Sequence, residues 1–532
     1  MTLRDGAGAP PQGGAQPLVR RNDWGSLAPP ALGEWTPRLS VSVVVPTYAA
    51  RATLPYVLAG LAAQSYPAHL LEVVVVDDGN SPPVELPDVR PERTRVVRVE
   101  SGWGRANACH TGALAGDGEV IHWLDSDMLV FREHVEAQLR WHHLVDYTVV
   151  LGTKRFVDPA PLLERDPADV RDLVAAGRAD ELWDWDAGEP HKWVEGMWRR
   201  TGDLTEAGPR AFRAHVGATG SLTRALYDDA GGMDTALILG EDMELGHRLA
   251  EAGGVLVPEH AARAWHLGRS HVMEKKDDVN RHNDSFLANL VPGMRPKRNL
   301  HGRTYDVPYL EVVVDAPPSD ELIHCVDAVL DSTLDDLRVV LPGSWHELHD
   351  GRRSPLADPL LDLRIVERTY RHDPRVELVP GVPPGRCRSS FRLTLDSTAW
   401  APTPVALQAM LDDLERTHEG TRIIRRVGRL DRTAAVSRVA RALGQVSDDG
   451  LDAAFGLQVL ASSQAGFVPT AERDVPRHEG KLKPPVDPAE SRARLAADLG
   501  SPGDGHVHDA AVGDDVRDRQ DGERRGLFGR RL

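Results

Sequence analysis

Few cysteines and no long apolar run occur in this sequence, and both absences narrow the class of protein. Its 532 residues include only three cysteines, Cys109, Cys325 and Cys387. They are far apart and form no C-x-x-C pair, so we expect neither a disulfide scaffold nor a thiolate zinc site. No apolar segment approaches the roughly 20 residues that span a bilayer, and the mean hydropathy is -0.35. We therefore expect no transmembrane segment, and peripheral association with a membrane stays open.

Basic residues are in deficit. The chain has 63 Lys and Arg against 80 Asp and Glu, a net charge of -17. The negative electrostatic field of such a chain repels nucleic acid, so we expect no nucleic-acid partner. Binding of an anionic ligand would need a metal ion, arginines or backbone amides. The first residues are rich in Gly, Pro and Ala, without an apolar core after a basic start. Residues 1–38 are therefore predicted to be a flexible tail, not a signal peptide, and the protein is predicted to be cytoplasmic.

A strand, a helix and a second strand are predicted after this tail. The apolar run from Val41 to Val45 is followed by a helical pattern from Leu54 to Gln64 and by a buried strand from Leu71 to Val76. Nearly all-apolar strands in this order form βαβ units, in which the parallel sheet is covered on both faces. Ligands of such sheets bind at the carboxyl ends of the strands. We therefore predict an α/β domain with its site at that edge.

Acidic pairs stand at two such strand ends. Asp77-Asp78 follows the second strand, and Asp125-Ser126-Asp127 follows a later apolar strand, residues 120–124. Strand alternation would point the carboxylates of Asp125 and Asp127 in the same direction. Oxygen ligands on one side suit Mg²⁺ or Mn²⁺, which complete their coordination with water and substrate phosphates. An isolated D-x-D is usually a solvated turn, but several acids at strand ends favour a metal site.

Another acidic pair, Glu241-Asp242, opens a predicted helix that continues to Ala252. A carboxylate at a helix start can be a cap or a partner of the helix dipole. It can also act as a general base that takes a proton from an acceptor hydroxyl. His266 lies beyond the next strand and could return as a nitrogen ligand of the metal, although a lone histidine after tryptophan is more often structural. His271 competes for the same role.

The strand-helix-strand pattern begins again past residue 302. Leu310 to Val314 matches the first strand, Leu337 to Leu341 the second, and Asp396 matches Asp125, at a nearly constant offset of about 270 residues. Farther on, residues 455–469 resemble 245–258 at an offset of about 210 residues. The sequence therefore predicts a second copy of the domain. Two unrelated α/β segments with the same rhythm are the alternative.

The second copy lacks the acids of the first. Thr398 replaces Asp127, and Leu451 replaces Glu241. We predict a catalytic domain over residues 39–300 and a degenerate, smaller α/β domain over 305–480. Residues 481–532 have few large apolar side chains, which is typical of a disordered tail.

Six segments of the first copy resemble, in order, the inverting family 2 glycosyltransferases. Together they lie within about residues 39–290. They are Val43 to Tyr48, Val75 to Gly79, Arg105 to Gly112, Leu124 to Asp127, Gly217 to Ser221, and Gly240 to Leu249. The resemblance implies the GT-A nucleotide-diphosphosugar transferase fold, a mostly parallel central sheet flanked by helices. It also implies a nucleotide-sugar donor, commonly a UDP-sugar, and a glycan or other hydroxyl acceptor, as in the synthesis of cell-envelope polysaccharides.

The resemblance assigns roles to the donor side of the site. Pro46, Thr47 and Tyr48 would line the nucleotide pocket, and Asp77 or Asp78 would accept a hydrogen bond from the base.

The same resemblance assigns the remaining donor and metal contacts. Arg105 would face the donor where the family often has lysine, and Asp125 would contact the ribose or sugar. Asp127 would bind the Mn²⁺ or Mg²⁺ ion, with His266 as a further ligand.

On the acceptor side, Asp242 would be the catalytic base and Glu241 would touch the acceptor. An acidic segment from about 158 to 203 is rich in tryptophan and looks like an insertion that covers a cleft. Its tryptophans could stack on acceptor sugars or form a hydrophobic flap, and both interpretations stay open. They are Trp183, Trp185, Trp193 and Trp198.

Two other functions compete with this prediction. A nucleotidyltransferase that acts on a sugar phosphate would also carry acids at strand ends, but it usually has a Gly-rich phosphate loop, and none follows residues 41–46. A non-catalytic carbohydrate-binding scaffold would not need the acids of the first copy. The family's Gln/Arg-x-x-Arg-Trp motif is absent, which argues against a processive, membrane-spanning synthase. The sequence does not indicate the oligomeric state.

Overall fold

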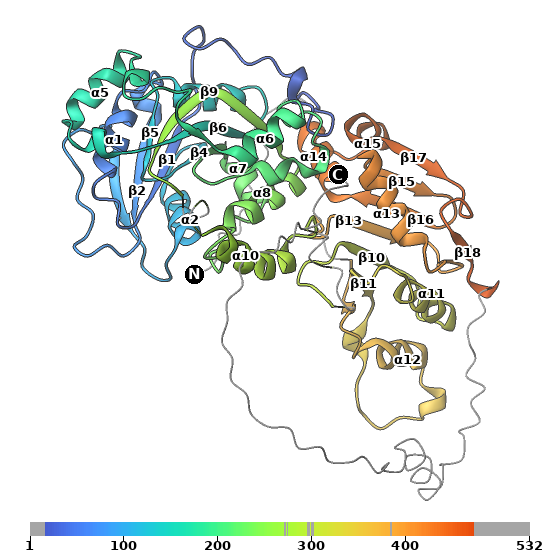
Figure 1. Cartoon of the computed structure of the whole chain (residues 1–532). Coiled ribbons are helices and arrows are strands. Elements are labelled where there is room, and N and C mark those ends of the chain that lie inside the picture. The colour runs from blue at the N-terminus through green and yellow to red at the C-terminus, as the bar shows by residue number, and fades with distance from the viewer. Residues whose placement is uncertain are drawn as a thin grey trace, which may run out of the picture. The chain divides into compact units, whose positions relative to one another are not determined.

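The computed structural model describes residues 16–472 except 271–272, 274, 295–297, 299–302 and 383–385. The predicted C-terminal tail, residues 481–532, lies outside the described residues. The described residues fall within one compact unit and contain two large sheets (Figure 1). The predicted boundary between a catalytic and a second domain at about residue 300 stays a prediction. None of the described helices is both long and apolar enough to cross a membrane.

The first sheet has nine strands in the order β3-β2-β1-β4-β8-β6-β9-β5, with β7 paired to β6. Its strands are β1 Val41–Thr47, β2 Leu71–Asp77, β3 Thr94–Arg98, β4 Val120–Leu124, β5 Met128–Val130, β6 Thr148–Val157, β7 Glu189–Pro190, β8 Thr219–Thr223 and β9 Val255–Leu267. Strands β1 to β4 run parallel, and β8 is antiparallel to both β4 and β6. The predicted α/β class is confirmed.

Helices cover both faces of this sheet, which explains its nearly continuous apolar strands. On one face, valines of β1 and β2 pack with α2, α7 and α8; on the other face, alternate valines pack with α1 and α3. The helices are α1 Leu54–Ala62, α2 Arg105–Ala115, α3 His134–His142, α7 Arg224–Asp229, α8 Glu241–Glu251 and α10 Lys276–Leu290. This arrangement leaves the carboxyl edge of the sheet to the loops that carry the predicted site.

The predicted insertion folds into α4 Ala160–Leu163, α5 Pro167–Ala175, strand β7 and α6 Lys192–Arg200. Trp183 and Trp185 pack against Trp265 at ring-centroid distances of 5.4 and 5.1 Å. Trp198 is 3% exposed, whereas Trp193 is 44% exposed. Three of the four tryptophans in this segment therefore stabilise the insertion, and one faces solvent.

The second sheet has seven strands in the order β12-β11-β10-β13-β16-β15-β17, and β14 pairs separately with β18. The seven strands are β10 Leu310–Val314, β11 Leu337–Pro342, β12 Val376–Val379, β13 Phe391–Leu395, β15 Thr421–Ile424, β16 Gly428–Arg432 and β17 Leu457–Leu460, and the separate pair is β14 Trp400–Pro402 and β18 Phe467–Pro469. The helices of this part are α11 Asp320–Leu330, α12 Leu361–Tyr370, α13 Ala406–Thr417, α14 Thr433–Leu443 and α15 Asp448–Phe455.

The two sheets share their strand order and their register. Val41 pairs with Leu71 and Val120, and Leu310 pairs in the same way with Leu337 and Phe391. In both sheets the next strand, β8 or β16, is antiparallel. These registers support the predicted repeat, whose common origin stays a prediction.

One part of the predicted repeat alignment is wrong. Val257 lies in the half of β9 that pairs with β6, whereas Val468 lies in β18, which pairs with β14. The strand equivalent to the start of β9 is β17, which pairs in parallel with β15. Val257 and Val468 each end a short apolar stretch before a proline, so the two stretches resemble each other in composition although they occupy different strands.

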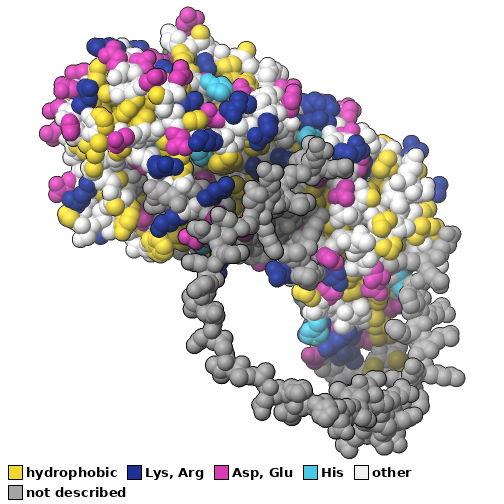
Figure 2. Space-filling model, viewed as in Figure 1, with side chains coloured by type: hydrophobic (Ala, Val, Ile, Leu, Met, Phe, Trp, Pro, Cys, Tyr) yellow, Lys and Arg dark blue, Asp and Glu magenta, His cyan; other side chains and the backbone are white. Residues whose placement is uncertain are grey.

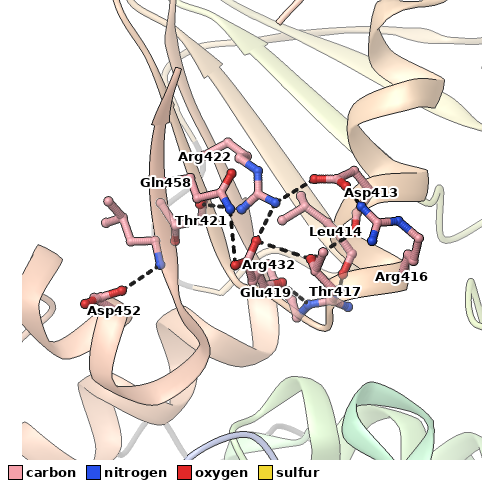
Figure 3. Close-up of polar contacts among 11 residues, drawn as sticks. Asp413, Leu414, Arg416, Thr417, Glu419, Thr421, Arg422, Arg432, Asp452 and Gln458 are labelled. Carbon is pink, nitrogen blue, oxygen red and sulfur yellow. Dashed lines mark hydrogen bonds and ion pairs between the residues drawn. The ribbon is translucent and has the colours of Figure 1, made fainter. Parts of the chain in front are cut away.

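A network of ion pairs holds the C-terminal end of α13 to β15 in the second sheet (Figure 3). Arg422 is 1% exposed, and its Nη2 donates to Asp413 at 2.8 Å and to Glu419 at 2.5 Å. Arg432 donates from Nη1 to Glu415 at 3.0 Å and from Nη2 to the carbonyl of Leu414 at 3.1 Å. Each buried guanidinium therefore has carboxylate partners, as a buried charge requires.

The N-terminal segment is packed where the structure describes it. Val19 is fully buried, and Asn22 donates from its amide to the carbonyls of Leu204 and Leu256 while its own carbonyl accepts from the N–H of Leu256. A buried amide with three partners fixes its segment. The prediction of a flexible tail over residues 1–38 did not anticipate this anchoring. Residues 1–15 lie outside the described part of the chain.

Candidate active site

Arg105 lies at the centre of the candidate site. Its Nε donates to Asp125 Oδ1 at 2.9 Å and its Nη1 to Glu241 Oε1 at 3.1 Å, while Nη2 donates to the carbonyl of Gly217. A Cβ at position 217 would lie 2.3 Å from Arg105 Nη1, so a larger residue there would displace the guanidinium. One guanidinium therefore joins the end of β4, the start of α8 and the segment before β8.

Asp125 and Asp127 lie in a turn and not in a strand. β4 ends at Leu124, and the N–H of Met128 donates to the carbonyl of Asp125 at 3.1 Å. The geometry expected from strand alternation is wrong, because this hydrogen bond closes a turn between β4 and β5. The two carboxylates still interact: burial, and then the charge of Asp125, raise the pKa of Asp127 to about 7.

Asp127 and His266 are the residues that fit a metal ion. His266 Nε2 is 3.8 Å from Asp127 Oδ1, an enclosed oxygen that has no hydrogen-bond partner among the described residues. Because His266 Nδ1 donates to the carbonyl of Gly268 at 3.1 Å, Nε2 presents its lone pair. The described residues contain no group of three or more His, Cys, Asp or Glu side chains that could hold a metal. A cation would therefore also need oxygens from a phosphate or water. His271, the competing candidate, lies outside the described residues.

The two acids at the end of β2, Asp77 and Asp78, have different hydrogen-bond partners. Asp77 is 1% exposed, and its two oxygens accept hydrogen bonds from Asn80 and from the N–H of Val84. Burial alone would raise the pKa of Asp77, but the hydrogen bonds from Asn80 and Val84 and the charge of Arg98 together lower it. Asp78 Oδ2 accepts from the N–H of Gly104 at 2.8 Å, and its enclosed Oδ1 has no partner among the described residues. Of the two acids predicted to contact a nucleotide base, Asp78 is the one with a carboxylate oxygen that has no partner among the described residues.

The other predicted donor-pocket residues lie at the end of β1. Thr47 is buried and donates from its hydroxyl to the carbonyl of Val45, while Tyr48 is 69% exposed. Pro46 is half-buried beside them. The structure gives no direct contact between these three residues and Arg105, so their role as a donor pocket stays a prediction.

The pair Glu241-Asp242 opens α8, directly after Gly240, whose φ of 79° is left-handed. Glu241 is 6% exposed, and burial, followed by the charge of Asp242, raises its pKa to about 7. Asp242 Oδ2 accepts from the N–H of Gly217 at 3.1 Å, and Oδ1 accepts from the N–H of Met243 at 2.7 Å. Asp242 therefore fixes the backbone around it, and each of its oxygens retains further lone pairs for a proton.

Lys154 belongs to the same cluster and was missed by the sequence analysis. This residue of β6 is 5% exposed. Burial lowers its pKa to about 8, against the charges of Asp125, Asp242 and Asp127. Its one visible signal is a lysine that follows the apolar first half of a strand, where a buried charged side chain needs a partner. A cation at this place can neutralise part of the acidic cluster or of a bound phosphate.

Charged side chains of both signs also mix on the outer surface that Figure 2 shows. The net charge of -17 is therefore not spread as a uniform acidic field. Within the site, Arg105 and Lys154 stand among four carboxylates, those of Asp125, Asp127, Glu241 and Asp242. This local excess of negative charge suits a divalent cation.

Comparison with known proteins relates one segment of the chain to a family. Residues 42–213 match the sequence profile of glycosyl transferase family 2. This segment is a family 2 glycosyltransferase domain. It contains Asp78, Arg105, Asp125 and Asp127, while the acidic pair of α8 and His266 lie beyond the matched residues.

Curated relatives of the family 2 domain are glycosyltransferases. The pre-mycofactocin glycosyltransferase of Mycobacterium tuberculosis is 28% identical over 207 residues, 38% of this chain and 39% of the relative. The validoxylamine A glucosyltransferase of Streptomyces hygroscopicus subsp. jinggangensis is 28% identical over 255 residues, 45% of this chain and 57% of the relative. The chain thus spans between about two fifths and three fifths of the length of these relatives.

Solved structures give a weaker likeness. S. aureus TarS 1-349 in complex with UDP-GlcNAc has 18% sequence identity, covers 49% of this chain and 68% of that chain, and gives a TM-score of 0.34. The mannosyltransferase PcManGT from Pyrobaculum calidifontis in complex with GDP-Man and Mn²⁺ has 19% identity over 51% of this chain and 75% of that chain, with a TM-score of 0.31. Scores this low support no argument about the site.

Proposed function

We propose that the protein is an inverting glycosyltransferase that moves a sugar from a UDP-linked donor to a hydroxyl of a glycan or other acceptor, with Mn²⁺ or Mg²⁺. One observation carries the proposal. The guanidinium of Arg105, in the family 2 segment, forms hydrogen bonds with Asp125 of that segment and with Glu241 of α8, next to the pair Asp127 and His266.

The residues of this cluster have distinct tasks in the proposed reaction. Asp127 and His266 would hold the cation, which when bound neutralises charge on the departing nucleoside diphosphate. Asp78 offers an enclosed oxygen to the base of the nucleotide. Arg105 holds Asp125 toward the donor and keeps Glu241 in place at the start of α8.

The acceptor side depends on the carboxylates of α8. Asp242 takes the proton of the acceptor hydroxyl as this hydroxyl attacks the sugar carbon from the face opposite the leaving group. The anomeric configuration is thereby inverted, and no covalent sugar-enzyme intermediate is needed. Two main-chain N–H groups hold the carboxylate of Asp242 in one orientation, which fixes the direction of proton transfer.

Donor turnover tests the proposal. The full chain is incubated with UDP-glucose, UDP-GlcNAc, UDP-galactose and GDP-mannose, with Mn²⁺ or with a chelator, and release of nucleoside diphosphate is followed. We expect slow hydrolysis of a UDP-sugar that requires the cation and is lost in Asp242→Asn. A folded protein that binds UDP but hydrolyses none of these donors would support the non-catalytic carbohydrate-binding alternative.

A further inference from the structure

A row of side chains leads across the first sheet from the candidate metal site to the insertion. His266 of β9 pairs in register with Met128 of β5, the residue after Asp127, and with Phe156 of β6. Phe156 pairs in turn with Glu189 of β7. Because neighbouring strands lie about 4.8 Å apart, Glu189 is two strand spacings from His266. The insertion is therefore fixed beside the site.

Aromatic rings follow the same direction. The ring of Phe156 lies 4.5 Å from that of His266 and 5.8 Å from that of His191, and His191 lies 5.5 Å from Trp193. Phe156 and His266 are both 5% exposed, whereas Trp193 is 44% exposed. The series therefore begins in the interior, at the candidate metal ligand, and ends in a large aromatic side chain that faces solvent.

Trp193 stands on a rigid support. It lies in the first turn of α6, and Glu195 of this helix accepts from Arg155 Nη1 at 2.5 Å. Arg155 is the neighbour of Phe156 in β6, so the helix is tied to the sheet next to the aromatic row. A platform that is held in place loses little conformational entropy when a ligand binds.

A charged rim borders Trp193. Lys192 Nζ donates to Glu189 Oε1 at 2.9 Å, and Arg269 lies 4.0 Å from the other carboxylate oxygen of Glu189. The apolar face of a sugar ring packs on an aromatic ring, and its hydroxyls need charged or polar partners at the edge. Trp193 with this rim offers both.

We propose that Trp193, with Glu189 and Lys192, binds a sugar ring of a glycan acceptor, one that lies beyond the ring whose hydroxyl reacts. The inference rests on the proposed transferase function. Phe156 and His191 lie between His266 and Trp193 in the series of ring contacts, so we expect the sugar ring that packs on Trp193 to differ from the ring whose hydroxyl meets Asp242. The acceptor is therefore an oligosaccharide of at least two sugar units.

A glycan array tests the proposal with the full-length protein in the presence of UDP and Mn²⁺. The array carries mono-, di- and tetrasaccharides of the common α- and β-linked hexoses and N-acetylhexosamines. We expect the wild type to bind the longer members of at least one series and not the matching monosaccharide. Trp193→Ala should weaken this binding about tenfold, the factor that corresponds to 1.4 kcal/mol, while Trp193→Phe should retain most of it.

Two controls separate the outcomes. Leu163→Ala changes another exposed apolar residue of the insertion, 41% exposed, and should leave glycan binding unchanged. Donor hydrolysis with Mn²⁺ should proceed equally in the wild type and in Trp193→Ala. The proposed role of Trp193 would be refuted by any of three results: no binding of the wild type to any oligosaccharide, equal binding by Trp193→Ala, or equal binding of monosaccharides. Glycan binding through Trp193 without turnover of any donor would overturn the transferase function alone.

Discussion

Replacing Arg105 by methionine would test how the candidate site is held together. The substitution keeps most of the side-chain volume and removes the charge that pairs with Asp125 and Glu241. Breaking a fully buried ion pair costs about 3–5 kcal/mol. Arg105 is 23% exposed and Asp125 25%, so solvent screens part of this cost, and we expect a loss of about 2–3 kcal/mol at pH 8.

The loss should depend on pH because of Glu241. Its pKa is 4.5 in the unfolded reference and about 7 in the folded protein, so the folded state binds more protons between these values and stability falls as pH rises through them. Without Arg105 the folded-state pKa of Glu241 rises further. Each pKa unit of this rise lowers the free energy of unfolding by about 1.4 kcal/mol at a pH above the new pKa. The effect of Arg105→Met should therefore be smallest near pH 5 and largest near pH 8.

Urea unfolding at pH 5, 6.5 and 8 measures this dependence. In the background of Glu241→Gln, the effect of Arg105→Met should depend less on pH, because Glu241 no longer titrates; the remaining dependence comes from groups such as Asp127, whose pKa Arg105 also lowers. Arg178→Met removes an exposed ion pair with Glu181 and serves as the control, with no measurable change expected. An effect of Arg105→Met that is equal at all three pH values would refute the assignment of Glu241 as its titrating partner.

Three other predictions follow from the same structure. Burial lowers the pKa of His122 to about 4 and of His134 and His142 to about 3; the unfolded chain therefore binds more protons than the folded chain at these three positions below about pH 6.5, and their imidazoles should stay neutral in the folded protein at about pH 5.5. An NMR titration in which any of the three imidazoles is charged at about pH 5.5 would argue against neutral buried histidines. Asp77→Asn should cost about 1–3 kcal/mol because Asp77 holds the loop after β2, whereas Asp78→Asn should mainly weaken UDP binding in calorimetry; the reverse pattern would exchange their roles. Calorimetry on the full chain should give one UDP site, and a stoichiometry of two would show that the second sheet also binds nucleotide.

The parallel half of each sheet could be predicted from the sequence, because buried parallel strands are nearly all apolar. Val41 to Val45 and Leu71 to Val76 are strands within a residue or two of the predicted limits. The repeat offset also predicted that Leu310 takes the register of Val41. These features depend on local composition, which a single sequence contains.

Features that depend on tertiary contacts were not predictable in the same way. The turn at Asp125 is set by a hydrogen bond from Met128, and the anchoring of Asn22 is set by carbonyls at Leu204 and Leu256. The sequence separation between Arg105 and Glu241 is 136 residues. Six of the predicted site residues do converge, because acids and glycines at strand ends indicate the functional edge of the sheet. Their roles in metal and donor binding remain proposals.

The most direct test of the proposed donor site is calorimetry of UDP binding with and without Mn²⁺, for the wild type and for Asp127→Asn. This substitution is isosteric and removes a carboxylate whose Oδ1 is enclosed without a partner among the described residues, so the fold should persist. Asp117→Asn, at an exposed acid of the loop before β4, is the control. We predict that Mn²⁺ strengthens UDP binding to the wild type and the control, and that this gain is absent in Asp127→Asn. An undiminished Mn²⁺ effect in Asp127→Asn would contradict the assignment of Asp127 as the metal ligand.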